Sequence, residues 1–376
     1  MSSWTSHSFK TIAIAQGVPA DAIQKLVEEG ERLRLKGVPV IFTLGHLAAI
    51  CDVPYKYLRD IISRRFDPYK VFNIRKRSGG YRQITVPEAA LMRVQRWLHE
   101  NILAPAKVSP ISTAFSAGSG PVKNAEQHSG SRWLVKVDVK SFFESVSERQ
   151  VFKAFRTLGY PALLSFELTR LCTRFPSGES KRNQRRWQTN GRAYDIEPYM
   201  TQVVGHLPQG APTSPMLANL VCADLDLRLM ALASKHGGVI TRYADDIVFS
   251  ATQCERLRGK ILIKEITVAL AALGFKRNET KTHVVPPSAR RLVTGLLVDS
   301  GTPRLTKAFR DKLRMHLFHA RTKGIRIHCE RRKFRSLIGF REHLRGLIAY
   351  AAQVDKKFAA ERKTEFEALP WGILGV

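Results

Sequence analysis

TRYADDIVFS, residues 241–250, places two adjacent carboxylates, Asp245 and Asp246, between apolar stretches rich in β-branched and aromatic residues. Two such stretches joined by a short polar turn predict a β-hairpin with the acids at its tip. Adjacent acids on a tight turn repel each other, which favours a cation between them. Mg²⁺ suits this position because it binds one or two carboxylates together with substrate phosphates. The segment therefore predicts a metal-binding hairpin, with a solvated acidic turn as the alternative.

A third acid lies in a second apolar strand. Residues 133–139, WLVKVDV, have a strand pattern that carries Asp138 near its end. If this strand and the hairpin belong to one sheet, Asp138, Asp245 and Asp246 can share two divalent ions. Nucleotidyl transfer uses such a pair, because one ion lowers the pKa of the attacking hydroxyl and the other stabilises the leaving pyrophosphate. Taken alone, Asp138 reads as a strand-end acid bonded to backbone N–H groups.

The order of elements around these acids predicts an α+β fold. Along the chain we expect a strand at 133–139, helices at 141–158, 161–171 and 214–232, the acidic hairpin, a helix at about 255–273 and a strand at 291–298. Strand–helix–strand–strand–helix–strand order, with helices on one face of a small sheet, is the split βαβ or ferredoxin-like plan. Residues 174–200 are polar, basic and turn-rich, and we interpret them as an excursion from this plan.

The flanking regions predict helices and one further hairpin. Residues 70–87 alternate apolar and polar around a Ser-Gly-Gly turn, which predicts a β-hairpin, and a helix follows at about 88–103. Residues 19–66 have helical spacing. The part at 44–62 faintly resembles a helix-turn-helix, for which we favour a packed helical pair. Residues 301–376 carry 18 Lys and Arg against 7 acids and predict a basic helical bundle.

The charge of the chain indicates a polyanionic partner. The 376 residues include 61 Lys and Arg against 32 acids, a net charge of +29. In a globular protein with 44% hydrophobic residues, such an excess indicates nucleic acid before any other partner. A basic membrane-surface protein is the weaker alternative, because no basic amphipathic helix dominates the sequence.

Cysteine usage and the N-terminus indicate an intracellular setting. Five scattered cysteines without a Cys-x-x-Cys pair argue against a disulfide framework and against a structural zinc site. The N-terminal segment MSSWTSHSFK has no apolar signal region, and nowhere does an apolar run approach the length of a membrane span. We therefore expect a cytosolic (cytoplasmic) protein with reduced thiols and no membrane partner.

Together the motifs resemble those of reverse transcriptases, and specifically of the retron-type family, from about residue 70 to about residue 350. VDVKSFF (137–143) resembles the first palm motif of that family, LPQGAPTSPMLAN (207–219) the second, and GFKRNETKT (274–282) the motif after the acidic hairpin. Retron enzymes are set apart by an Asn-Ala-x-x-His box, which residues 124–128 match, and by a Val-Thr-Gly box, which residues 293–295 match.

The resemblance implies a role for each matched residue of the catalytic motifs. Asp138, Asp245 and Asp246 are the expected ligands of two Mg²⁺ ions, for which Mn²⁺ can substitute. Lys281 is expected to protonate the pyrophosphate leaving group. The residues expected to bind the incoming dNTP are Lys76 and Arg82 through its phosphates, Phe143 by excluding a 2′-OH, and Gln209 with Gly210 in a loop under the nascent base pair. Core packing is the simpler role for Phe142 and Phe143.

The resemblance also implies contacts with RNA. In the retron family the two boxes engage a structured non-coding RNA, so we expect contacts from Asn124 and His128, one helical turn apart, and from Val293, Thr294 and Gly295. A hydrogen-bonded structural histidine is the alternative for His128. Gly295 within a strand predicts a close backbone approach, of RNA or of the sheet itself.

The implied architecture is a right-hand polymerase with fingers, a ferredoxin-like split βαβ palm and a helical thumb. We expect an N-terminal helical region at 1–66, fingers at 67–130, a palm at 131–300 that includes fingers elements at about 145–200, and a basic thumb at 301–376. RGLIAYAAQVD (345–355) resembles the thumb helix of these polymerases, which places Arg345 and Tyr350 near the nucleic-acid duplex.

The implied function is an RNA-dependent DNA polymerase that copies part of a structured non-coding RNA into short single-stranded DNA. In the retron family synthesis starts from the 2′-OH of an internal guanosine, so RNA and DNA remain joined in a branch. The family acts in defence against phage, often by restraining a separate effector. The implied partners are the RNA as primer and template, its DNA product, dNTPs and a separate effector protein.

Other polymerases and one non-enzyme remain as alternatives. A group II intron enzyme is disfavoured because little sequence follows the expected thumb. A diversity-generating enzyme is disfavoured by the Leu-Pro-Gln-Gly…Ser-Pro pattern at 207–215, whereas an abortive-infection polymerase shares the catalytic motifs. An RNA-binding scaffold with an idle active site is expected to have lost a catalytic acid, yet Asp138, Asp245 and Asp246 are all present.

Overall fold

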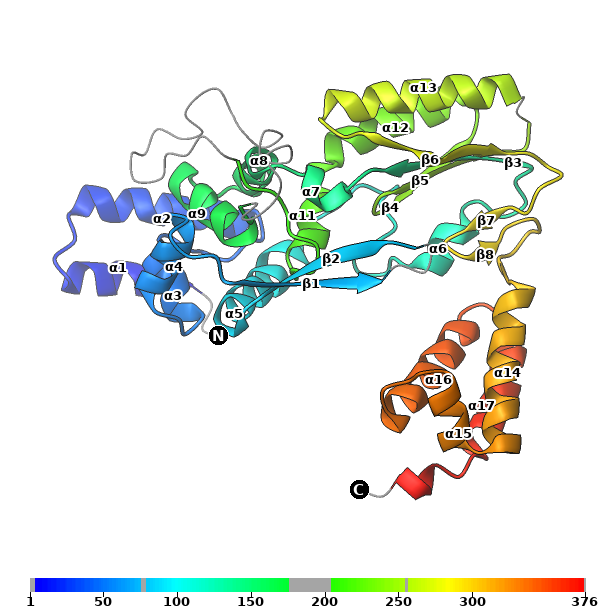
Figure 1. Ribbon diagram of the computed structural model, residues 1–376. Coiled ribbons are helices and arrows are strands. Elements are labelled where there is room, and N and C mark those ends of the chain that lie inside the picture. The colour runs from blue at the N-terminus through cyan, green and yellow to red at the C-terminus, as the bar shows by residue number, and fades with distance from the viewer. Residues whose placement is uncertain (1–3, 76–78, 176–203, 254–255, 375–376) are drawn as a thin grey trace. The chain divides into compact units, whose positions relative to one another are not determined.

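The computed structural model describes residues 4–75, 79–175, 204–253 and 256–374. The chain divides into two compact units, each built from segments that are far apart in the sequence (Figure 1). The first unit falls within residues 1–118, 138–229 and 267–278, and the second within residues 119–137, 230–266 and 279–376. Most of the excursion expected at 174–200 lies outside the described residues.

The first unit begins with helices that each bury one face. They are α1 (Ser6–Ala15), α2 (Ala20–Leu35), α3 (Leu44–Ile50) and α4 (Tyr55–Ile62). Thr43 caps α3, because its hydroxyl accepts a hydrogen bond from the backbone N–H of His46. Leu58 and Ile62 of α4 are fully buried, and α4 packs against α9 (Ala162–Cys172). The helix-turn-helix pattern at 44–62 is therefore a packed helical pair.

The glycine hairpin forms as its sequence predicts. Strands β1 (Tyr69–Arg75) and β2 (Tyr81–Pro87) pair antiparallel, with Tyr69 opposite Pro87. Gly79 and Gly80 have φ angles of 89° and 75°, which glycine adopts without steric cost. Helix α5 (Ala89–Leu98) follows and continues as a π-helix at His99–Leu103.

Two of the predicted helices are each broken into a pair. The segment at 141–158 forms α7 (Phe142–Ser145) and α8 (Glu148–Leu158), because Ser147 and Gln150 make a capping box that begins a new helix. The segment at 214–232 forms α11 (Ser214–Val221) and α12 (Ala223–His236), with Cys222 between them.

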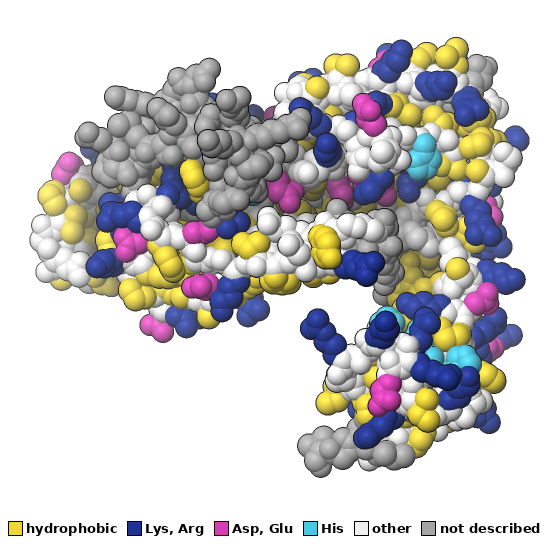
Figure 2. Space-filling model, in the orientation of Figure 1, with side chains coloured by type: hydrophobic (Ala, Val, Ile, Leu, Met, Phe, Trp, Pro, Cys, Tyr) yellow, Lys and Arg dark blue, Asp and Glu magenta, His cyan; other side chains and the backbone are white. Residues whose placement is uncertain are grey.

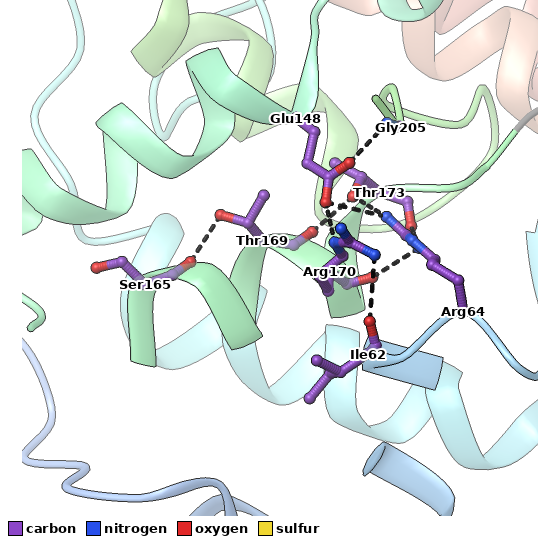
Figure 3. A network of polar contacts seen from close by, with 8 residues as sticks. All are labelled: Ile62, Arg64, Glu148, Ser165, Thr169, Arg170, Thr173 and Gly205. Carbon is purple, nitrogen blue, oxygen red and sulfur yellow. Dashed lines mark hydrogen bonds and ion pairs between the residues drawn. The ribbon is translucent and has the colours of Figure 1, made fainter. Parts of the chain in front are cut away.

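A buried network of charges joins α8 to α9 and to the backbone at Gly205 (Figure 3). Glu148 and Arg170 form an ion pair in which both side chains are 1% exposed, and Arg64 Nη2 lies 3.4 Å from the same carboxylate oxygen. The other oxygen of Glu148 accepts a hydrogen bond from the backbone N–H of Gly205 at 2.6 Å. The network thereby fixes the chain just before the Pro208-Gln209-Gly210 loop.

A four-stranded sheet carries the acidic motifs. Its strands are β3 (Trp133–Val139), β4 (Val239–Tyr243), β5 (Asp246–Ala251) and β6 (Arg277–Val285), in the order β4-β5-β3-β6. This is the strand order of the ferredoxin-like plan that the sequence predicts. Helix α13 (Arg256–Ala272) lies along one face (Figure 1), where a Cβ added at Gly259 would touch Val284 at 2.9 Å and Val135 at 3.4 Å. Glycine at position 259 thus permits close packing of α13 on the sheet.

The strand predicted at 291–298 is instead a tight hairpin of β7 (Leu292–Val293) and β8 (Leu296–Leu297). Strand β9 (Arg304–Leu305) completes a three-stranded sheet. The basic tail then forms the predicted helices, which are α14 (Lys307–Lys323), α15 (Ile325–Arg331), α16 (Leu337–Ala352) and α17 (Lys356–Glu367). One cluster of buried residues, including Leu134, Val293, Leu313, Phe340 and Phe366, runs through the sheets and helices of the second unit.

The described cysteines are buried free thiols, namely Cys51, Cys172, Cys222 and Cys329, whereas Cys254 lies outside the described ranges. In the part of the chain that the structure describes, no helix is both long and apolar enough to cross a bilayer.

Candidate active site

The two adjacent acids lie at the tip of the predicted hairpin. Tyr243 pairs with Asp246, so Ala244 and Asp245 form a two-residue turn between β4 and β5. Ala244 has a φ of 56°, in the left-handed region that the turns of tight hairpins require at their first position. Alanine adopts this conformation with some strain. Both acids at the end of the hairpin are half-buried.

A buried arginine supports this turn, although no feature of the sequence singles it out. The side chain of Arg242 is fully buried, and its Nη1 donates a hydrogen bond to the carbonyl of Ala244 at 3.4 Å. A buried guanidinium requires polar partners, because an isolated charge is costly in the interior. In the sequence Arg242 is one basic residue among many, and nothing in the strand pattern shows that it points inward.

His128 links the two strands of the hairpin. Its Nδ1 lies 2.7 Å from Ser250 Oγ on β5, and its Nε2 lies 2.7 Å from Thr241 Oγ1 on β4. The ring is 0% exposed, and burial lowers the pKa of His128 from 6.5 to about 4. A neutral imidazole therefore bridges two hydroxyls at the base of the acidic hairpin.

The structure offers no exposed side-chain surface for the predicted RNA contacts of Asn124 and His128. Both side chains are fully buried, Asn124 on α6 (Pro121–Glu126) and His128 just after it. Both ring nitrogens of His128 are already bonded within the protein, so the alternative of a hydrogen-bonded structural histidine is correct. A short sequence box fixes neither the depth nor the direction of its side chains.

The Val-Thr-Gly box forms a turn and packs against the segment that carries the other box. Thr294 and Gly295 have φ angles of 46° and 85°, as a type I′ turn requires. The hydroxyl of Thr294 donates to the carbonyl of Pro121 at 2.6 Å, and Val293 is fully buried. A Cβ added at Gly295 would meet no protein atom within 4 Å, so the sheet does not approach this glycine closely. The backbone angle explains the glycine.

Asp138 and Asp246 lie on β3 and β5, which are adjacent in the sheet. Asn278 Nδ2 on β6 donates to Asp138 Oδ1 at 2.8 Å. Lys136, two residues before Asp138 on β3, has its Nζ 3.8 Å from Asp246 Oδ2. The sequence predicts a cation beside Asp245 and Asp246, and the ammonium group of Lys136 is a cation beside Asp246. Of Asn278 and Lys136, only Lys136 could have been predicted from the sequence to lie near the acids, because residues two apart on a strand share one face of the sheet.

The donor set on these strands suits a divalent cation. Carboxylate oxygens are the ligands that Mg²⁺ prefers, usually one or two of them together with substrate phosphates. Among the described residues, no group of three or more His, Cys, Asp or Glu side chains is arranged to hold a metal ion by itself.

The two phenylalanines of the first palm motif divide between core and surface. Phe142 is buried and its ring lies 5.9 Å from that of Phe275. Phe143 is half-buried, and its ring lies 5.5 Å from Phe142 and 6.3 Å from Phe115. Core packing therefore explains Phe142, and Phe143 keeps an accessible face.

The Gln209-Gly210 loop lies directly against the glycine hairpin. The backbone N–H of Thr85 on β2 donates to the carbonyl of Gln209 at 2.7 Å. Gly210 has a φ of 123°, and a Cβ there would lie 2.9 Å from Ile84 and 3.0 Å from the carbonyl oxygen of Thr85. Glycine at position 210 thus permits a close approach of the loop to β2 within the protein.

Two of the remaining expected catalytic residues are exposed. Arg82 is an exposed residue of β2, opposite Ile74, and Lys281 is an exposed residue of β6. Lys76 lies outside the described residues. In the tail, Arg345 is exposed and pairs with Glu342 at 3.0 Å. Tyr350 is half-buried, its ring lies 5.4 Å from that of Phe309, and burial raises its pKa.

Known proteins are similar to this chain over most of its length. Residues 74–296 match the family described as reverse transcriptase (RNA-dependent DNA polymerase). The retron Ec86 reverse transcriptase of Escherichia coli is 29% identical over 87% of this chain and 89% of its own length. Two relatives come from Myxococcus xanthus. The retron Mx162 reverse transcriptase is 33% identical over 86% of this chain and 66% of its own length, and the retron Mx65 reverse transcriptase is 32% identical over 90% and 74%.

The family match covers more than half of the chain and includes β3 with Asp138 and the hairpin with Asp245 and Asp246. The α+β architecture, with its ferredoxin-like strand order, is that of a right-hand polymerase, as the sequence predicts. The activity of this family is RNA-directed DNA polymerisation. The chain belongs to the reverse transcriptases and, within them, to the retron reverse transcriptases.

Proposed function

We propose that this enzyme copies part of a structured non-coding RNA into short single-stranded DNA. Synthesis starts from a 2′-OH of the same RNA, so that RNA and DNA remain branched. The observation that carries the proposal is the similarity to retron reverse transcriptases along about nine tenths of the chain, well beyond the catalytic segment 74–296. Both boxes typical of retron enzymes lie in that span, and Thr294 of one donates a hydrogen bond to Pro121 at the start of the segment that carries the other.

The catalytic centre of the proposal is the set Asp138, Asp245 and Asp246, which would hold two Mg²⁺ ions, with Mn²⁺ as a substitute. When bound, such ions lower the pKa of the attacking hydroxyl and stabilise the negative charge on the leaving pyrophosphate. The protein contributes by orientation. Arg242 supports the turn that presents Asp245, and Asn278 holds the carboxylate of Asp138 through one of its oxygens.

Other residues of the first unit bind and select the incoming dNTP. Arg82 is exposed on β2 and matches a phosphate pair with its guanidinium fork. The Gln209-Gly210 loop, fixed to β2 through Thr85, supports the nascent base pair. Phe143, whose ring is half-buried, excludes the 2′-OH of a ribonucleotide in this proposal. In the second unit, exposed Lys281 donates a proton to the pyrophosphate.

The assignment of regions follows the family architecture. We assign residues 1–66 to an N-terminal helical region, 67–130 to the fingers, 131–300 to the palm with fingers elements at about 145–200, and 301–376 to the thumb. The thumb offers the phosphate backbone a basic surface along α14, over which dark blue side chains gather in Figure 2. A hollow of about 310 Å³ at this helix is lined by Arg304, Lys307, Arg310 and Arg314 together with Asp311, Leu297 and Leu305.

The same proposal includes a role in defence against phage, with a separate effector protein as partner. It rests on the resemblance to the retron family. In that setting the RNA–DNA product and the enzyme form one complex, and the effector binds that complex.

Sequencing the nucleic acid that co-purifies with the protein from its native host tests the proposal. The sample is divided and one half is treated with debranching enzyme. We expect one abundant structured RNA, joined to short complementary DNA through a linkage that the enzyme cleaves. RNA without complementary DNA would contradict the proposal, and so would untemplated DNA attached to the protein, which an abortive-infection polymerase would leave.

A further inference from the structure

Phe115 has a backbone conformation that its side chain does not favour. Its φ is 67°, and for a bulky residue a positive φ is a genuine outlier that the surrounding structure has to impose. The residues before it, from Ile111 to Ala114, are all buried, whereas Phe115 itself is 42% exposed. The chain therefore leaves the core of the first unit at this residue, in a conformation that aims the aromatic ring.

A buried amide fixes the point at which the chain leaves the core. Asn219 on α11 is 1% exposed, and its Nδ2 donates a hydrogen bond to the carbonyl of Ala114 at 2.7 Å. Asn219 is the last residue of the LPQGAPTSPMLAN motif, and the proposed chemistry gives it no role. The motif that supplies the Gln209-Gly210 loop thus also sets the backbone immediately before Phe115.

The ring of Phe115 lies against Phe143, the residue proposed to exclude the 2′-OH. The two ring centroids are 6.3 Å apart with their planes at 44°, a tilted geometry that is favourable for aromatic pairs. Phe142 contacts Phe143 as well, with centroids 5.5 Å apart, and is itself packed on Phe275. Phe143 is therefore held between a buried ring and a half-exposed one.

We propose that Phe115 is a positioning residue for Phe143 and that it thereby sets the discrimination against ribonucleotides. An aromatic side chain rejects a 2′-OH only while its ring is held in place, because a ring that can turn about χ1 yields to the extra oxygen. Phe142 restrains one side of Phe143, Phe115 restrains another, and Asn219 holds Phe115. This inference rests on the proposed role of Phe143.

The test compares kcat/KM for dCTP and for CTP on one RNA template, in the wild type and in variants. Phe115→Ala removes the ring, and Phe115→Gly removes it while accepting the positive φ without strain, which protects folding. Phe115→Leu keeps part of the bulk. Phe66→Ala is the matched control, since Phe66 is also 42% exposed and also pairs with an aromatic ring, that of Tyr57 at 5.9 Å. Phe143→Ala reports on the proposed role itself.

We expect Phe143→Ala to lose most of the dCTP preference, and Phe115→Ala and Phe115→Gly to lower the preference roughly fivefold, the range of one aromatic pair. Phe115→Leu should lie between these and the wild type, and Phe66→Ala should match the wild type. The double variant Phe115→Ala with Phe143→Ala should be no less selective than Phe143→Ala alone, because the two residues act through one ring.

The possible failures are distinguishable. If Phe143→Ala lowers the preference and both Phe115 variants keep it, the positioning role is overturned and the proposed role of Phe143 stands. If Phe115→Ala lowers kcat/KM equally for dCTP and CTP, Phe115 is merely structural and the inference is again overturned. If Phe143→Ala leaves the preference unchanged, the proposed role of Phe143 fails, and the inference fails with it.

Discussion

The amide of Asn278 on β6 donates a hydrogen bond to the carboxylate of Asp138 on β3, with Nδ2 2.8 Å from Oδ1. The two residues are 140 positions apart in the sequence. Asn278 lies in the segment 274–282, in which the sequence pointed to Lys281. Because Asn278 holds Oδ1 of Asp138, the second carboxylate oxygen has less freedom to move. Residues that hydrogen-bond to metal ligands orient those ligands in this way.

Asn278→Ala should therefore weaken the response to metal. We expect the Mg²⁺ concentration for half-maximal DNA synthesis to rise roughly tenfold or more, because loss of an outer-shell partner typically costs 10–100-fold in metal affinity or activity. A Mg²⁺ titration of RNA-templated dNTP incorporation measures the change. Asn101→Ala, which removes an amide bonded to the carbonyl of Trp97, is the control. An unchanged half-maximal concentration in Asn278→Ala would show that the bond does not orient Asp138.

His128 should make the stability of the protein sensitive to acid. Its pKa is lowered from 6.5 to about 4 in the folded state by burial. At a pH above 6.5, the pKa of the unfolded chain, the ring is neutral in both the folded and the unfolded state. As the pH falls from about 6.5 toward 4, the unfolded chain takes up a proton that the folded chain rejects, so stability is lost. The loss is about 2 kcal/mol near pH 5.

Urea unfolding of the wild type and of His128→Gln, at neutral pH and near pH 5, measures this effect. His316 is also buried with a pKa of about 4, so the wild type alone does not isolate His128. The difference in stability between wild type and variant should shrink by about 2 kcal/mol on acidification. A difference that is the same at both pH values would mean that folding does not lower the pKa of His128.

Much of the sheet follows from local sequence patterns, because strand period and turn chemistry are local. The hairpins at 70–87 and 239–251 and the strand at 133–139 are confirmed. The break before α8 had a local signal too, since Ser147 and Gln150 stand three apart as a capping box does. The local sequence indicated the turn at Thr294-Gly295 more weakly, because threonine is β-branched and such residues rarely adopt the positive φ that the turn requires.

The direction in which motif residues point could not be predicted, because their partners are remote in the sequence. The two hydroxyls that bond His128 come from residues 122 and 113 positions away. Arg242 is one of 61 basic residues, and only the fold shows that it is buried. Charge composition correctly indicated the class of partner, because an excess of charge is a property of the whole chain.

Gly210→Ala should disturb the loop that the Gln209 carbonyl anchors to Thr85. The added Cβ would lie 3.0 Å from the Thr85 carbonyl oxygen, on a backbone with a φ of 123°. We expect a severalfold higher KM for dNTP and a loss of stability. Gly237→Ala is the matched control, because Gly237 also has a positive φ of 63° but nothing within 4 Å of an added Cβ. That control should lose about 1 kcal/mol in stability and keep the wild-type KM.

Steady-state kinetics and thermal unfolding of the two glycine variants separate strain from crowding. A Gly210→Ala enzyme with the KM and stability of Gly237→Ala would show that the loop tolerates the extra carbon. Crowding against Thr85 would then not be the reason for glycine at position 210.

Glu148→Gln should be strongly destabilising. The change leaves Arg170, which is 1% exposed, without its ionic partner and weakens the bond to the N–H of Gly205. Breaking a buried pair by neutralising one member costs roughly 3–5 kcal/mol. Asp224→Asn breaks the exposed pair with Lys153, whose side chains are 63% and 76% exposed, and should cost under about 1 kcal/mol. Equal midpoints for the two variants in urea unfolding would contradict a structural role for the buried pair.

RNA-templated DNA synthesis by Asp138→Asn, Asp245→Asn and Asp246→Asn, each purified with its bound RNA, is the measurement to make. Asparagine keeps the shape of the side chain and removes the charge that a divalent cation requires. We predict that each variant retains its RNA and makes no DNA, while Asp224→Asn makes DNA at the wild-type rate. DNA synthesis at the wild-type rate by the double variant Asp245→Asn with Asp246→Asn would contradict the assignment of this hairpin as the catalytic centre.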